Sequence, residues 1–171
     1  MIVFEERLGE LVELLPDLTD ASGNTFDIRY NWGTIDVLNK FLLLKESQSK
    51  YPLIWLSTEQ DDSHNLNEPF VKRTARIIIA TRSDKQDEFN PFIYETDYKL
   101  ILQPIADWLV QALQQSGASI LNGNTFRSRR VPNFSINNNG NQVIDVWNAI
   151  VIDAEITFNN ITNCLNTINF N

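Results

Sequence analysis

The sequence predicts an α+β fold: a mostly antiparallel mixed sheet of about four to five strands, two or three helices packed against it, and a long C-terminal β-hairpin. Three observations predict it. Apolar residues recur at helical spacing in residues 4–15 and 94–116. Residues 70–82 are rich in β-branched side chains, and residues 144–158 alternate between apolar and polar side chains.

The amino-acid composition limits the classes of protein to which this chain can belong. Of 171 residues, 43% are hydrophobic and 21% charged, as in soluble globular proteins large enough to bury a core without disulfides or metal. We expect one domain over residues 1–160 and a polar tail over 161–171. Cys164 is the only cysteine, which excludes an internal disulfide and a thiolate zinc cluster and predicts a reducing compartment.

The net charge limits the classes of partner that this chain is expected to bind. The net charge is −8, which argues against tight wrapping of nucleic acid and against docking on anionic lipid. The first twenty residues are acidic, and no later apolar run is long enough to span a bilayer. We therefore expect a protein that is made in the cytoplasm and has no membrane partner.

The N-terminal part predicts two helices separated by a strand. Residues 4–15 carry one apolar stripe, and Pro16 ends that helix. Residues 26–30 alternate as a short strand, followed by a turn at residues 32–34. Thr34 can cap a second helix. The apolar stripe of that helix comprises Ile35, Leu38, Phe41 and Leu42.

The middle of the chain predicts the centre of the sheet. Residues 51–56 form a compact apolar run typical of a buried strand, and residues 60–69 read as a loop. Residues 70–82 predict a long strand whose consecutive Ile77, Ile78 and Ile79 indicate cover on both faces.

The longest helix is predicted over residues 94–116, closed by Gly117. Pro104 lies inside the pattern, where its ring clashes with the carbonyl of Leu100. We therefore expect a kink or a helix in two pieces, with Pro104 near the start of the second.

The last third predicts a hairpin. Residues 126–136 form a strand that Pro132 restricts to a sheet edge, and residues 137–141 supply an Asn-Gly turn. The strand 144–158 could reach roughly 50 Å, so it either bends or extends beyond its domain to meet a neighbour. Asn148 is the one polar residue on its apolar side.

Two groups of residues invite a catalytic or metal-binding interpretation. Asp61, Asp62 and His64, with Ser63 between them, combine hard-cation ligands with a base beside a hydroxyl. Neighbours in a loop rarely converge on one atom, so we favour a solvated loop. Glu95 and Asp97 resemble a carboxylate pair, but acids are typical of a first helical turn. The common phosphate-cradling motifs are absent, and we expect no cofactor, metal or catalytic residue.

Arg127, Arg129 and Arg130 form the one basic cluster of the sequence. They would lie near Arg73, Arg76 and Arg82 if the two strands paired. A local basic surface on an acidic chain suits phosphate or an acidic protein surface, and we favour the protein partner.

The order of elements resembles that of tail-terminator and neck-ring proteins of tailed bacteriophages. The residues that carry the likeness are 94–105, the helix that continues to Leu113, and the closing strand 145–156. The likeness spans roughly residues 1–158.

The resemblance implies a structural subunit of the virion without catalysis. Such a subunit forms a ring, usually of six copies, that caps the tail tube and joins it to a head-completion or connector protein at the head–tail junction. Genomic DNA passes through the ring without specific binding, and an acidic lumen would suit that passage. Two alternatives stay open: another head–tail connector or tail-tube component, and a small metal-dependent enzyme that uses Asp61, Asp62 and His64.

Overall fold

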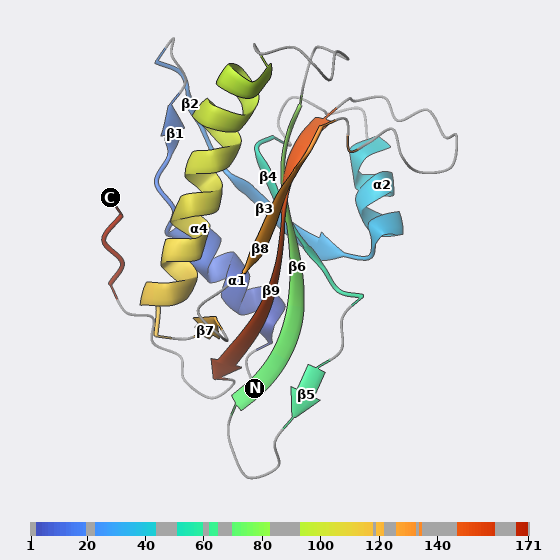
Figure 1. The fold of residues 1–171 in the computed structure, drawn as a ribbon, viewed down its shortest axis with the longest axis vertical. Coiled ribbons are helices and arrows are strands. Elements are labelled where there is room, and N and C mark those ends of the chain that lie inside the picture. Colours follow the sequence, from blue (N-terminus) through green and yellow to red (C-terminus); the bar gives the residue numbers. More distant parts are fainter. Residues whose placement is uncertain are drawn as a thin grey trace.

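The computed structural model describes residues 3–19, 23–43, 51–59, 62–64, 70–82, 93–117, 119–121, 126–132, 134, 147–159 and 167–170 (Figure 1). The helices are α1 (Phe4–Glu13), α2 (Ile35–Leu43) and α4 (Gln103–Gln115), with the π-helix η2 (Tyr94–Leu102) directly before α4. The strands are β1 (Leu18–Thr19), β2 (Thr25–Phe26), β3 (Arg29–Gly33), β4 (Leu53–Ser57), β5 (Asp62–His64), β6 (Phe70–Arg82), β7 (Ser119–Leu121), β8 (Arg127–Val131) and β9 (Trp147–Asn159).

The main sheet confirms the predicted fold class. Its path within the described residues is β3-β4-β6-β9-β7, with β5 also on β6 and β8 also on β9. The β3–β4 pair is parallel, and all other pairs are antiparallel. Five of these strands have five or more residues, as expected, and β5 and β7 add three residues each. The β8–β9 pair is the predicted C-terminal hairpin.

Strands β6 and β9 form the spine of the sheet. They pair without a break over thirteen residues, from Phe70 opposite Asn159 to Arg82 opposite Trp147. Ile77, Ile78 and Ile79 at the middle of β6 are at most 1% exposed, which confirms the predicted cover on both faces. The two strands curve together along the length of the molecule (Figure 1), so the long closing strand bends with its partner.

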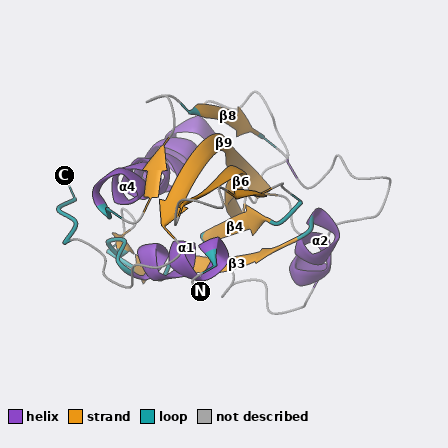
Figure 2. Cartoon of the chain, turned by 90° about the horizontal axis from the view of Figure 1, so that it is seen from below, coloured by secondary structure: helices purple, strands orange, loops and turns teal. Residues whose placement is uncertain are grey.

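Each face of the sheet has its own core (Figure 2). On the face that we call the α4 face, α1, η2 and α4 pack on alternate residues of β6 and β9, among them Ile77 and Ile152. On the opposite face, the α2 face, Leu38 of α2 packs with Trp55, Ile78 and other residues of the sheet. Figure 1 shows α2 beside the upper part of the sheet only.

Local signals explain the helices. The apolar stripe predicted for residues 4–15 is buried, and α1 ends at Glu13 before Pro16. Thr34 caps α2 as predicted, since its Oγ1 accepts a hydrogen bond from the backbone N–H of Val37 at 3.3 Å. Gly33 has a φ of +149°, and a Cβ there would meet the Trp55 ring at 3.1 Å.

The predicted strand over residues 26–30 is wrong in its bounds. Thr25–Phe26 pairs with β1, and a separate strand, β3, runs from Arg29 to Gly33, through the predicted turn. The reason is the partner: β3 lies beside β4 in register over five residues, beginning with Arg29 opposite Leu53. The position of β4 therefore sets where the strand begins and ends.

The long helix has two pieces, as predicted. The π-helix η2 gives way to α4 at Gln103, and Pro104 occupies the first turn of α4, where the change of helix type accommodates its ring and its missing N–H. The helix ends at Gln115, two residues before Gly117 with a φ of +69°.

Three predictions concern residues near the edges of the described ranges. The loop predicted over residues 60–69 contains strand β5, whose Asp62 lies opposite Arg73 of β6, so that part of the prediction is wrong. The predicted turn at residues 137–141 lies outside the described residues. In the tail, Ile168 and Phe170 pack against the core, and Gln111 of α4 donates a hydrogen bond to the Asn169 carbonyl at 2.8 Å.

Candidate functional site

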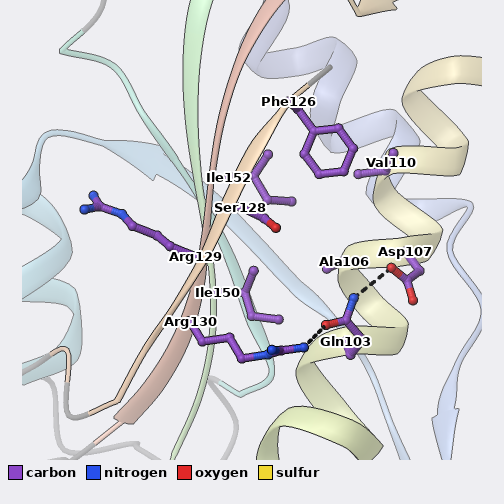
Figure 3. Close-up of a pocket in the computed structure, with 10 residues that line it drawn as sticks. All are labelled: Gln103, Ala106, Asp107, Val110, Phe126, Ser128, Arg129, Arg130, Ile150 and Ile152. Atoms are coloured by element: carbon purple, nitrogen blue, oxygen red, sulfur yellow. Dashed lines mark hydrogen bonds between the residues drawn. The ribbon is translucent and has the colours of Figure 1, made fainter. Parts of the chain in front are cut away.

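The predicted basic cluster lies on β8, which pairs with β9 at an edge of the sheet. The condition for the expected nearness to the arginines of β6 is not met, because β9 lies between β8 and β6 and the two strands do not pair. Successive side chains of a strand point to opposite faces, so β8 divides its arginines. Arg127 and Arg129 share the α2 face with Val131, which packs on the core there. Arg130 points the other way, toward α4 (Figure 3).

The Arg130 guanidinium contacts side chains of η2 and α4. Its Nη2 donates a hydrogen bond to Gln103 Oε1 at 3.1 Å, and Gln103 Nε2 donates to Asp107 Oδ1 at 2.9 Å (Figure 3). The Arg130 guanidinium also lies 5.3 Å from the centre of the Tyr94 ring, a cation–π contact. Arg130 therefore ties the edge strand to η2 and α4.

A cavity of about 230 Å³ lies between β8, β9 and α4 (Figure 3). Its apolar walls come from Phe126, Val110, Ile150 and Ile152, and its polar rim includes Gln103, Asp107, Ser128 and Arg130. Most of the polar rim is already engaged in the Arg130–Gln103–Asp107 chain of hydrogen bonds. The cavity therefore combines apolar walls with a polar rim whose side chains largely bind one another.

Arg127 and Arg129 belong to a wider charged surface on the α2 face. We call it the open face: Lys72, Thr74, Arg76, Arg127, Arg129, Asp153, Glu155 and Thr157. The register places Arg76, Asp153 and Arg127 side by side across β6, β9 and β8. Arg76 Nε contacts Asp153 Oδ1 at 2.7 Å, and Lys72 Nζ contacts Glu155 Oε1 at 3.0 Å.

The open face carries more positive than negative charge. Among the described residues, it has four cationic side chains and two carboxylates, and both carboxylates already pair with cations of β6. Arg127 and Arg129 are exposed, and within the described residues no hydrogen bond or ion pair holds either guanidinium. Of the predicted basic cluster, Arg127 and Arg129 are therefore the members whose guanidinium groups have no partner in the described part of the chain.

The Asp61, Asp62 and His64 interpretation can be followed for two of its residues, since Asp61 lies outside the described residues. Asp62 and His64 are exposed on β5, and strand alternation directs Ser63 to the opposite face. Asp62 Oδ2 accepts a hydrogen bond from Arg73 Nη2 at 2.6 Å, and this contact lowers the pKa of the Asp62 carboxyl. Ser63 therefore does not point to the same side of the sheet as Asp62 and His64.

Arg73 is the centre of a structural cluster on the α4 face. Its guanidinium also binds the Glu5 carboxylate of α1, and it lies 5.5 Å from the Phe4 ring centre and 5.9 Å from that of Phe158. The hydrogen bonds that Arg73 donates to Asp62 and Glu5 raise the pKa of its guanidinium. The cluster joins β5, β6 and α1. It also engages the carboxylate of Asp62, one of the two acids that the catalytic alternative needs.

The two acids of the helix start also have separate roles. Glu95 is exposed and pairs with Lys99 one turn later, at 2.8 Å. Asp97 turns inward, where its Oδ2 accepts a hydrogen bond from Asn148 Nδ2 at 2.8 Å. Burial, and then the Asp97 carboxylate, raise the pKa of the neighbouring Tyr98 hydroxyl. The carboxylate pair is therefore not formed.

The Asp97–Asn148 contact explains the one polar residue on the apolar side of the closing strand. Asn148 is fully buried, and a buried amide is stable only when it is hydrogen-bonded. Its isolation in the alternating pattern was the available signal, although nothing in the sequence pointed to Asp97 as its partner. The same alternation could have predicted the open face. Arg127 and Arg129 lie at odd-numbered positions of the strand and Arg130 at an even-numbered one, so Arg130 points to the other face.

Comparison with known proteins adds no relative. No family model matches the chain, and no curated protein matches it. Across the described part of the chain, His, Cys, Asp and Glu side chains nowhere gather in a group of three that could hold a metal ion. None of the described helices has the length and apolarity to cross a membrane. Cys164 lies outside the described residues.

Proposed function

We propose that this chain is a structural subunit of the head–tail junction of a tailed bacteriophage, a tail terminator or neck protein that assembles into a ring. In this role it caps the tail tube, contacts the head-completion or connector protein, and lets the genome pass through the ring. Six copies per ring is the stoichiometry that the family resemblance implies. The proposal places the chain at the head–tail junction of the virion and assigns it no reaction.

The observation that carries the proposal is the open face beside an edge strand. Arg127 and Arg129 stand exposed on β8, and the sheet ends there within the described residues. A subunit of a closed ring needs surfaces that recognise another copy, and an edge marked by charge limits non-specific pairing.

The fate of the candidate catalytic groups supports a structural role. Asp62 is engaged by Arg73, Asp97 by Asn148, and Glu95 by Lys99. Each of these carboxylates stabilises a contact between or within elements of the fold. These three acids thus serve packing and local pairing.

The proposed ring has a definite electrostatic arrangement. The chain carries a net charge of −8, while the open face carries an excess of positive charge. Passage of DNA favours acidic walls, since these repel phosphate. The open face therefore faces a protein neighbour, and a basic lumen in the assembled ring would count against the proposal.

Electron microscopy of purified chain mixed with tail tubes tests the proposal. The expected result is a ring at one end of each tube. Protein found within the tube wall or on the head side alone would assign it to another connector or tube component. The catalytic alternative predicts instead that replacing Asp61, Asp62 and His64 together abolishes a measurable turnover or metal binding while particles remain intact.

A further inference from the structure

We infer that the open face of one copy docks on the outer surface of helix α1 of the next copy. This inference rests on the proposed self-assembly and names the two surfaces that would make it. The occupant of the open face is thus a second copy of this chain, held by an acidic helix.

The acidic surface lies on α1 and just beyond it. Glu6, Glu10 and Glu13 follow one another at spacings of four and three residues, which places them along one side of α1, and Asp17 follows beyond the end of the helix at Glu13. All four are exposed. Glu10 pairs with the buried Arg7, whereas Glu6 and Glu13 have no ion pair within the described residues.

The two surfaces are complementary in charge and in form. The open face offers Arg127 and Arg129, whose guanidinium groups have no partner among the described residues, and α1 offers the Glu6 and Glu13 carboxylates. Guanidinium and carboxylate groups form strong, directional pairs. An exposed stretch of sheet can also accept the length of a helix such as α1, which has ten residues.

The positions of the two surfaces determine the symmetry of the contact. Helix α1 packs on the α4 face of the sheet, and the open face lies on the α2 face. The copies therefore meet through different surfaces, head to tail, and each copy keeps one of each surface free for the next. A heterologous contact of this kind closes into a ring or continues as a filament.

Acidic protein is the occupant that the charges favour over nucleic acid. The open face has an excess of two positive charges among the described residues, whereas tight binding of nucleic acid depends on many Lys and Arg contacts with phosphate. Asp153 and Glu155 pair with Arg76 and Lys72. The same two carboxylates hold Arg76 and Lys72 in place and leave Arg127 and Arg129 as separate anchors. A second copy of a chain with a net charge of −8 supplies the required acidic surface at the concentration of the protein itself.

Reciprocal charge reversal in the full chain tests the inference. One variant carries Arg127→Glu with Arg129→Glu, and the other carries Glu6→Lys with Glu13→Lys. Sedimentation velocity at low and high salt measures self-association. We expect each variant alone to associate at least about tenfold more weakly than the wild type, because like charges then oppose each other. An equimolar mixture should recover association, since each variant supplies the surface that the other lacks.

A matched control separates the local contact from the change in net charge. Arg29→Glu with Lys40→Glu lowers the net charge by the same amount as Arg127→Glu with Arg129→Glu does. Its two positions are on β3 and α2, which are not part of the open face. We expect this control to associate as the wild type does. Thermal unfolding of every variant checks that the fold is retained.

The outcomes separate the inference from the proposed function. Unchanged association in both reversal variants would overturn the interface while rings at tube ends would still support the function. Wild-type protein that stays monomeric at all salt concentrations, or an open face that binds a DNA oligonucleotide in place of α1, would also overturn the inference. Tubes without caps would contradict the function whatever the reversal variants do.

Discussion

The upper and lower halves of the β6–β9 spine differ in how the two faces of the sheet are buried. In the upper half, residues 77–80 of β6 and their partners on β9 are buried on both faces of the sheet. In the lower half, residues 71–76 are buried only on the α4 face, and the α2 face carries the exposed Lys72, Thr74 and Arg76. The same two strands, in one continuous register, thus pass from a core to a surface.

The difference shows that strand pairing and burial are separate properties here. Pairing is continuous along all thirteen residues, whereas helix cover on the α2 face stops with α2 and its neighbours. The upper half therefore contributes stability, and the lower half supplies a surface. The following predictions test that division, from the largest expected effect to the smallest.

Truncating the same face of β6 in each half should give very different results. Ile78→Ala removes a side chain that is 1% exposed, and we expect a loss of about 2–5 kcal/mol in the free energy of unfolding. Thr74→Ala, four residues away on the same face, should change it by less than about 0.5 kcal/mol. Urea unfolding measures both. Equal losses would show that the lower half is covered like the upper one.

The buried pair at the top of the spine should be strongly coupled. Asn148→Ala leaves the Asp97 carboxylate without that amide donor, and we expect a loss of about 1–3 kcal/mol in the free energy of unfolding. A double-mutant cycle with Asp97→Ala measures the coupling. Strictly additive losses would contradict a direct interaction between the two side chains.

The cluster at the lower end of the spine should depend on pH. The pKa of Asp62 is lowered below its ordinary value of 3.8 by the hydrogen bond from Arg73. A carboxyl whose folded-state pKa is depressed stabilises the fold above its unfolded-state pKa, and the gain disappears as the pH falls through the folded-state value. Asp62→Asn should therefore be less stable than the wild type at pH 6, and the difference should shrink below about pH 4. A difference that grows on acidification would contradict the contact.

Replacing the two adjacent arginines of β8 should give the smallest difference in the free energy of unfolding. Arg130→Ala removes the hydrogen bond to Gln103 and the contact with Tyr94, and we expect a loss of about 0.5–1 kcal/mol in the free energy of unfolding. Arg129→Ala should leave stability unchanged within about 0.5 kcal/mol, because no described residue binds its guanidinium. Denaturant unfolding of the two variants in parallel measures the gap, and a reversed order would contradict their assignment to opposite faces.

Much of the fold could be predicted because its signals are local. The β-branched run gave β6 with its observed bounds, Phe70–Arg82, and the period-two pattern gave the buried side of β9. Pro104 gave the two-piece helix because proline acts on the preceding turn of its own chain.

The errors arose where a distant segment decides the structure. The start of β3 depends on its register with β4, and β5 exists because three residues of a predicted loop pair with β6. The partner of Asn148 lies 51 residues away, on η2. The three arginines were predicted as one cluster, although the strand predicted over residues 126–136 already places Arg130 on the opposite face from Arg127 and Arg129.

The most direct test of the account is a cryo-electron microscopy map of the self-assembled chain. The account predicts a closed ring in which Arg127 and Arg129 of each copy contact helix α1 of the next, so that the lower half of the spine is covered in the assembly. A map in which that surface faces solvent, with the copies joined elsewhere, would contradict it.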